Sequence, residues 1–195
     1  SSIIIKETLI DKPKLERNIN KKYVCIATHS SSYYKYWLRK NGWNDVIRYL
    51  KTLGYEVLCI DGDDVADYGS VKMHIPDGCI KKTGMRPLSE RINDLYFCDF
   101  FIGLGSGMSW LAWALKKPVV MISGFSAENC EFKNPYRVIN KNVCHGCWGK
   151  EGDPNDVFFC PKHYGTSRHH ECSKEITFEM VKDKIDQCRE DILKH

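Results

Sequence analysis

Mainly apolar runs of five or six residues recur along the first two thirds of the chain. They cover residues 23–28, 55–60, 99–103 and 118–122. Polar or glycine-containing segments bound each run, and short apolar stretches of this kind are typical of strands buried on both faces of a parallel sheet. The pattern therefore predicts four parallel strands.

Helical periodicity fills the intervals between these runs and the end of the chain. Apolar residues recur at steps of three and four positions in four segments, which we predict to be helices: residues 42–53, 88–95, 107–115 and 177–192. Gly54 is placed to end the first helix, and Pro87 suits the first turn of the second. The third is apolar on nearly every side, which predicts a helix buried in the molecule. Thr177 can cap the last helix, with Ile176 and Val181 as a hydrophobic staple.

The order of these elements, β-α-β-α-β-α-β, predicts an α/β fold. Such a chain forms one Rossmann-like parallel sheet with helices on both faces, and ligands bind outside the carboxyl ends of the strands. We divide the sequence into a lead-in segment (1–21), a Rossmann-like domain (22–141), a cysteine-rich insert (142–173) and a C-terminal helix that packs on the domain (174–195).

Four cysteines in the insert have the spacing of a metal knuckle. Cys144 and Cys147 are separated by two residues, and Cys160 and Cys172 follow in the next loop. Two thiolates from one tight turn and two from a following loop can complete a tetrahedron of soft ligands, which suits structural zinc or iron. Two disulfides are the alternative interpretation of the same spacing. Neighbouring histidines could also replace a thiolate; these are His169 and His170.

Composition and charge narrow the classes of function. The 195 residues are 43% hydrophobic, enough for one substantial core, and 29 basic against 25 acidic residues give a net charge of only +4. This small net charge does not provide the strong positive electrostatic field that attracts nucleic acid. The start offers no signal peptide and no run is long enough to cross a bilayer, so we expect a soluble, cytoplasmic chain without a membrane partner. Because the first residue is Ser1 and not Met, we also expect a piece of a longer protein.

A glycine-rich turn joins the third predicted strand to the third helix. Gly103, Gly105 and Gly107 allow backbone N–H groups to approach an anion, and Ser106 and Ser109 add hydroxyl donors at a helix N-terminus. The spacing lacks the Lys of a nucleoside triphosphatase loop and has Met108 where a dinucleotide-binding loop needs glycine. The pattern fits a phosphate-binding loop and an ordinary tight turn equally well.

A second polar cluster follows the first predicted strand. Hydroxyl groups and one cation there could hold a pyrophosphate from the opposite side, and nearby aromatic rings could stack on a base or sugar. The cluster runs from Thr28 through the serines 30–32 to Lys35. A solvated loop with an aromatic anchor is the alternative. Asp61, at the end of the second strand, could accept from a ribose hydroxyl or cap the following turn.

Several long strings resemble one family, the bacterial autotransporter heptosyltransferases, which are relatives of the lipopolysaccharide heptosyltransferases. The similarity extends over roughly residues 22–185. It rests above all on the stretch from Asp99 to Leu104 through Ser106-Gly107 to Ser109 to Trp113. Further matching strings are Cys25 to Thr28, Lys35-Tyr36-Trp37, Asn41-Gly42-Trp43, Val57 to Asp61, Pro87-Leu88 with Glu90-Arg91, Pro118 to Phe125 and Pro135 to Asn140. Strings of this length are too specific to be chance turns.

The resemblance implies the C-terminal half of a GT-B glycosyltransferase. Such an enzyme moves heptose from ADP-heptose to Ser hydroxyls of an autotransporter adhesin in the cytoplasm, and its general base lies in the N-terminal half, so no catalytic residue is assigned here. It also implies that iron binds the four cysteines and that Lys35 and the loop around Ser106 contact the donor. A homo-oligomer is a further possibility. The donor-binding residues that we predict are Thr28, Lys35, Gly105, Ser106, Gly107, Met108 and Ser109.

Two other functions fit parts of the sequence. The first is a metal-knuckle module that binds nucleic acid or protein without enzymatic activity. The insert contains Lys150, Lys162 and Arg168 but no long basic stripe, which disfavours nucleic acid. The second is rubredoxin-like electron transfer, which would require a second closely spaced cysteine pair. Cys160 and Cys172 stand too far apart for that.

Overall fold

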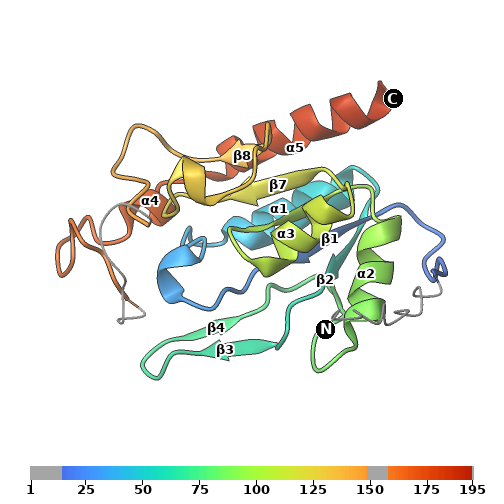
Figure 1. The fold of residues 1–195 in the computed structure, drawn as a ribbon, viewed down its shortest axis with the longest axis horizontal. Coiled ribbons are helices and arrows are strands. Elements are labelled where there is room, and N and C mark those ends of the chain that lie inside the picture. Colours follow the sequence, from blue (N-terminus) through green and yellow to red (C-terminus); the bar gives the residue numbers. More distant parts are fainter. Residues whose placement is uncertain (1–14, 149–157, 195) are drawn as a thin grey trace, which may run out of the picture.

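The computed structural model describes residues 15–148 and 158–194, and its centre is a six-stranded sheet (Figure 1). The strand order is β5-β2-β1-β6-β7-β8, and every pairing in this sheet is parallel. The strands are β1 (Tyr23–Ala27), β2 (Glu56–Cys59), β5 (Ile80–Lys81), β6 (Phe101–Leu104), β7 (Val119–Ile122) and β8 (Arg137–Val138). From β1 the chain first adds strands on one side and then crosses to the other, so the order reverses between β1 and β6.

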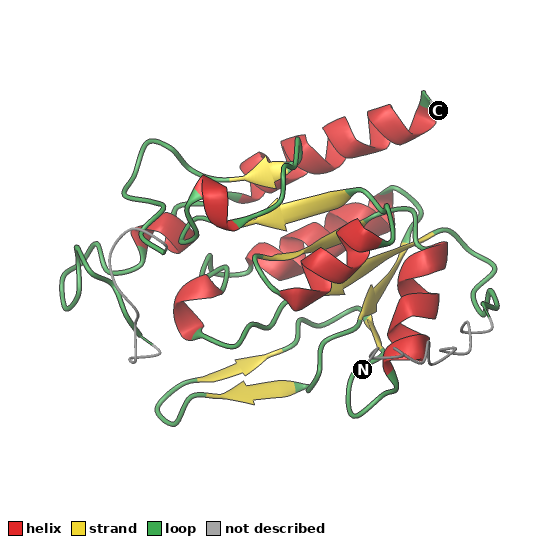
Figure 2. Ribbon diagram, in the orientation of Figure 1, coloured by secondary structure: helices red, strands yellow, loops and turns green. Residues whose placement is uncertain are grey.

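Helices cover both faces of the sheet, as the sequence predicts (Figure 2). On one face, α1 (Gly42–Thr52) and α5 (Phe178–Leu193) pack against Val24 and Ile26. On the other, α2 (Leu88–Phe97) and α3 (Gly107–Ala114) pack against Cys25 and Ala27. Successive side chains of a strand point to opposite faces, so an apolar run such as β1 is buried twice.

The four predicted strands and four predicted helices are all present. Two residues that the sequence places at helix ends are confirmed there. Gly54 has φ +83°, a left-handed conformation that suits glycine directly after a helix. The Thr177 hydroxyl accepts a hydrogen bond from the Met180 amide at 3.3 Å, which caps α5.

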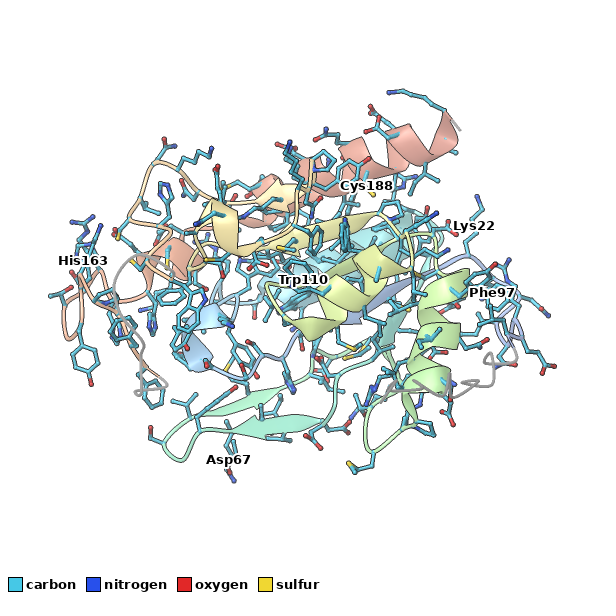
Figure 3. The ribbon with its side chains drawn as sticks, in the orientation of Figure 1. Lys22, Asp67, Phe97, Trp110, His163 and Cys188 are labelled. Atoms are coloured by element: carbon cyan, nitrogen blue, oxygen red, sulfur yellow. The ribbon has the colours of Figure 1, made fainter. Side chains whose placement is uncertain are left out.

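The predicted burial of α3 is wrong. Trp110 and Trp113 are 42% and 49% exposed, and only Ser109 and Ala112 of this helix are buried. The outward rings pack on Phe132, a residue at the edge of the core, with centroids 5.1 and 5.2 Å from its ring (Trp110 is labelled in Figure 3). A helix of two turns presents one face to a sheet, so apolar residues on its other face must find a different partner.

Short elements were not predicted from the sequence because two- to four-residue segments leave almost no periodic signal. They are the antiparallel hairpin β3 (Val65–Asp67) and β4 (Lys72–His74), the edge strands β5 and β8, the 3-10 helices η1 (Tyr33–Lys35) and η2 (Glu128–Cys130), and α4 (Glu171–Lys174). Residues 15–21 form neither helix nor strand. None of the helices in the described part of the chain combines the length and hydropathy of a membrane span.

The loop after β1 is joined to the distant segment before α5. The Trp37 indole donates to the Ile176 carbonyl at 2.9 Å, and the Leu38 amide donates to the Ser173 hydroxyl at 2.8 Å. The same hydroxyl donates to the Tyr36 carbonyl. These bonds join residues 139 and 135 positions apart, and they fix the β1 loop against the cysteine-rich end of the molecule.

Candidate functional site

A cavity of about 620 Å³ opens at the carboxyl ends of β1, β2 and β6. This is the point at which the strand order reverses, the usual ligand position in an open α/β sheet. The lining comes from three loops and the two helices above them: His29, Ser30, Ser31, Asp61, Gly62, Asp63, Ala66, Leu88, Ser106, Gly107, Met108 and Leu111.

Asp61 holds two of these loops together. Its carboxylate accepts from the Thr28 amide at 2.8 Å, the Thr28 hydroxyl at 2.9 Å and the His29 amide at 3.0 Å. Asp61 is only 3% exposed, and the Cys59 thiol also donates to it at 3.2 Å. The two roles suggested by its sequence position, a ribose acceptor or a cap of its own turn, are therefore replaced by a structural one. Its carboxylate is committed to the neighbouring loop.

The glycine-rich turn contributes the N-terminus of α3 to the cavity. Ser106 is the N-cap residue, and Ser106, Gly107 and Met108 line the space. Amides at the first turn of a helix and the partial positive charge of the helix end favour an anion. Ser109 is fully buried and its hydroxyl donates to the Leu104 carbonyl at 2.5 Å, so that hydroxyl is already used. Gly105 lies at the end of β6, outside the cavity lining.

Two polar side-chain atoms in residues that line the cavity are buried and have no hydrogen-bond partner among the described residues. They are Nε2 of His29 and Oγ of Ser30. Buried polar atoms are normally satisfied, and leaving one unpaired costs about 1–3 kcal/mol. His29 and Ser30 line the cavity, and a polar ligand or a water molecule that reaches these atoms would satisfy them.

The other predicted donor contacts, Thr28 and Lys35, are not among the residues that line the cavity. Thr28 is 2% exposed and is bonded to Asp61, so its side chain supports the loop and does not line the space. Lys35, at the end of η1, places its ammonium group 5.3 Å from the centroid of the Trp148 indole. That contact orients the side chain through a cation–π interaction and ties it to the cysteine-rich segment.

The cysteine-rich segment, residues 142–148 and 158–173 as described, gathers its thiols around an aromatic cluster. Cys147 and Cys172 are buried with Tyr34 and Phe125, and Cys144 packs at the edge. Burial, reinforced by the neighbouring Cys147, Cys160 and Cys144, raises the pKa of the Cys172 thiol to about 12. Burial of this kind keeps a thiol protonated, whether it is a structural thiol or a metal ligand before the metal binds.

The four sulfur atoms do not form one tight tetrahedron among the described residues. Two sets of three potential ligands lie within 4.8 Å of one another: Cys160 with His169 and His170, and Cys144 with His163 and Glu171. A site of four thiolates would need sulfur separations of about 3.8 Å, given metal–sulfur bonds near 2.3 Å. All ten cysteines are free thiols, so the two-disulfide alternative is not realised. The segment lies at the opposite end of the molecule from α2, as the labelled residues His163 and Phe97 show (Figure 3).

Glu171 fixes the first cysteine of the segment. Its carboxylate accepts from the Cys144 amide at 2.9 Å and from the Arg168 guanidinium at 2.7 and 2.8 Å. The Arg168 hydrogen bonds are the main reason that the pKa of Glu171 falls to about 2. Sequence reasoning missed this residue, because nothing in its local pattern shows that it reaches a residue 27 positions earlier.

Comparison with known protein families and curated relatives gives one consistent result. Residues 5–153 match glycosyltransferase family 9 (heptosyltransferase). Over 174 residues the chain is 49% identical to the autotransporter heptosyltransferase TibC of Escherichia coli, covering 88% of this chain and 43% of TibC. It is 48% identical over 178 residues to the autotransporter heptosyltransferase Aah of Escherichia coli, covering 88% of this chain and 46% of that relative. The chain thus spans less than half the length of these relatives.

Comparison with solved structures points to the same family. The chain superposes on TibC, described as a dodecameric iron-containing heptosyltransferase in complex with ADP-D-beta-D-heptose, with a TM-score of 0.88 and 47% identity over 92% of this chain and 48% of that one. It also matches the Escherichia coli ADP-heptose lipopolysaccharide heptosyltransferase II, with a TM-score of 0.60 and 16% identity over 89% of this chain and 47% of that one. The second likeness concerns the fold alone.

Proposed function

The chain belongs to glycosyltransferase family 9 (heptosyltransferase), and on that premise we propose that it is the donor-binding half of an enzyme that transfers heptose from ADP-heptose. The observation that carries this proposal is the cavity at the carboxyl ends of β1, β2 and β6, which His29, Ser30 and the N-terminal residues of α3 line. The N-terminus of α3 supplies amides for a diphosphate on the same wall. The donor contacts come from the loops 28–35 and 105–109.

We propose that the acceptor is a set of Ser hydroxyls on an autotransporter adhesin, glycosylated in the cytoplasm. Two relatives are named autotransporter heptosyltransferases, which supports an autotransporter as the acceptor. The chain aligns with less than half of each relative, and we assign the general base and the second wall of the cleft to an N-terminal half of the same enzyme. The dodecameric state of TibC supports assembly with further copies of the protein.

A structural iron ion in the cysteine-rich segment is the second part of the proposal. Cys144, Cys147, Cys160 and Cys172 are the ligands, with zinc as the alternative metal. The packing of Cys144, Cys147 and Cys172 in one cluster and the description of TibC as iron-containing support it. The metal would hold the segment in shape and leave the sugar chemistry to the protein side chains.

Isothermal calorimetry tests the function directly. We expect the protein to bind ADP-heptose and, more weakly, ADP, while single-stranded RNA of similar charge produces no heat. Tight binding of RNA with no response to ADP-heptose would overturn the donor site and favour the nucleic-acid-binding module.

Replacing Lys35 by Ala is expected to weaken ADP-heptose binding. Loss of a charge-assisted contact with the pyrophosphate should cost about 1.5–3 kcal/mol, which corresponds to one or two orders of magnitude in affinity. Calorimetry on this variant and on Lys40→Ala, an exposed lysine of the same loop, provides the comparison. Equal affinity of the two variants would remove Lys35 from the site.

The chain by itself is expected to bind the donor without transferring the sugar. Transfer requires a base within hydrogen-bond reach of the acceptor hydroxyl, and in a two-lobed transferase that base faces the donor from the other half. A radiolabel assay with the adhesin acceptor should show label on Ser only when the N-terminal half is supplied. Label on Ser with this chain alone would place the base within it.

A further inference from the structure

Two thiols lie on the same face of the sheet where β2 pairs with the edge strand β5. Cys59 is the last residue of β2, and its register partner in β5 is Lys81. Side chains of a strand alternate between the two faces of a sheet, so Cys79, two positions before Lys81, lies on the same face as Cys59. Both pack in the main core, with Cys59 fully buried and Cys79 partly buried. The β3–β4 hairpin forms most of the chain between them (Figure 1).

The two thiols are suited to different steps of one reaction. The hydrogen bond between them raises the pKa of Cys59 and lowers the pKa of Cys79, which the Lys81 ammonium lowers further. The thiolate is the nucleophile in thiol–disulfide exchange, and redox-active cysteines combine an accessible, more acidic thiol with a second thiol beside it. Cys79 therefore has the properties of the attacking thiol, and Cys59 is placed to complete the disulfide.

A second pair of neighbouring thiols lacks these properties. Cys25 and Cys98 lie in the core on the other face of the sheet, where they are 0% and 1% exposed. Burial raises the pKa of the Cys25 thiol. The two thiols donate to the carbonyls of Asp94 and Leu95 at 3.5 and 3.1 Å. Buried thiols that no reagent reaches are inert, so this second pair serves packing alone.

The backbone at Cys79 can adjust to a covalent bond with Cys59. A disulfide brings its two sulfur atoms to about 2.05 Å, so at least one of the two residues must move. Cys79 lies outside the strands, directly after Gly78, which has φ +84°. Cys59 is fixed by the sheet, and its carbonyl accepts from the Lys82 amide at 2.8 Å. The movement therefore falls on the turn before β5 and on the Cys59 side chain.

Cys59 also contacts the residue that holds the loop after β1. Its thiol donates at 3.2 Å to Oδ2 of Asp61, the same oxygen that accepts from the amide and hydroxyl of Thr28. A disulfide sulfur has no proton to donate, so oxidation removes this bond from a carboxylate that is only 3% exposed. Asp61 also binds the amide of His29, which lines the cavity. One residue thus separates the thiol pair from the cavity wall.

We propose that Cys59 and Cys79 form a reversible disulfide that loosens the loop after β1 and lowers the affinity of the cavity for its ligand. The effect on donor binding rests on the proposed function, whereas formation of the disulfide does not. The oxidant is a low-molecular-weight disulfide.

The exchange proceeds in two balanced steps. The Cys79 thiol loses its proton and attacks one sulfur of the external disulfide, which releases one thiolate and leaves a mixed disulfide on Cys79. The Cys59 thiol then loses its proton and attacks the Cys79 sulfur, which releases the second thiolate. The protein loses two electrons and two protons, and the external disulfide takes them up to become two thiols.

Treatment of the purified full-length protein with oxidised glutathione tests the proposal. Peptide mapping by mass spectrometry should find a Cys59–Cys79 disulfide. Calorimetry should show an ADP-heptose affinity about fivefold lower than in the reduced protein, and dithiothreitol should restore it. Cys79→Ser should bind ADP-heptose like the reduced parent before and after treatment. Cys130→Ser is the matched control, because Cys130 is also a partly buried free thiol outside the proposed metal ligands, and this variant should respond like the parent.

The outcomes separate this inference from the proposed function. A treated parent without a Cys59–Cys79 disulfide overturns the inference and leaves the donor site intact. An equal loss of affinity in treated Cys79→Ser also overturns it, because oxidation of the cysteine-rich segment would then be the cause, and metal content before and after treatment would show this. A disulfide that forms without a change of affinity overturns the link to the cavity. If the reduced parent binds no ADP-heptose, the proposed function is overturned together with that link, and the peptide map alone decides the disulfide. Thermal melting shows whether each variant is folded, and Cys79→Ala takes the place of Cys79→Ser if the latter does not fold.

Discussion

Replacing Cys172 by Ser is expected to empty the metal site. Metal content should fall from about one ion per chain to near zero, because a hydroxyl is a poor ligand for a soft site and Cys172 is a buried thiol with three cysteine neighbours. Structural metal sites contribute about 10–16 kcal/mol of apparent binding energy to small folded peptides, so the segment should lose its fixed shape. Elemental analysis and limited proteolysis measure both effects.

The same substitution should also weaken donor binding, although Cys172 lies outside the cavity. Tyr34 packs with Cys147 and Cys172, and Lys35 rests on Trp148 of the same segment. The neighbouring residue Ser173 holds the β1 loop through Tyr36 and Leu38. A loose segment therefore frees the loop that presents Lys35, and ADP-heptose affinity should decrease several-fold.

Cys79→Ser is the matched control, since Cys79 is a partly buried thiol just before β5 that packs against the main core and not against the cysteine-rich segment. It should retain both metal and affinity. A parent protein with no metal, whose cysteines are paired in disulfides by mass spectrometry, would contradict the metal site. Metal loss without increased proteolysis would contradict its structural role.

The second large effect is expected from Asp61→Ala. The substitution leaves the Thr28 amide, the Thr28 hydroxyl and the His29 amide without their acceptor in a buried position. Unpaired buried donors cost about 1–3 kcal/mol each, and the combined loss of stability should be about 3–5 kcal/mol. Urea unfolding gives this value from the shift of the midpoint at constant slope.

Donor affinity should fall together with stability, because the loop of His29 and Ser30 is no longer attached to the end of β2. Asp63→Ala is the control. Asp63 is exposed at the same cavity, and its removal should change stability by less than about 0.5 kcal/mol. Equal unfolding midpoints for the two variants would show that Asp61 does not hold the loops together.

Long periodic segments were predictable because their pattern arises from local geometry. The strands β1, β2, β6 and β7 and the helices α1, α2, α3 and α5 follow from apolar runs, three- and four-residue steps and the end signals Gly54 and Thr177. The loops at the carboxyl ends of the strands were also predictable as the position of the site, since parallel topology brings those ends to one edge.

Side-chain roles at that edge depended on contacts between distant residues. Thr28 and Ser109 have the right chemistry for a phosphate, yet one bonds to Asp61 and the other to Leu104, so neither hydroxyl is free. Trp110 was expected in the core and lies on the surface against Phe132. Sequence spacing gives the direction of a side chain relative to its own element but not which other element approaches it.

The sequence by itself determined the α/β class, the order of the long elements, the family and the two segments that supply the site, because each depends on residues close together in the chain. Only the tertiary structure decided that Asp61 joins the loops after β1 and β2 and that Glu171 reaches Cys144. These facts depend on packing between segments far apart in the sequence, where a shift of a few ångströms decides whether two groups bond.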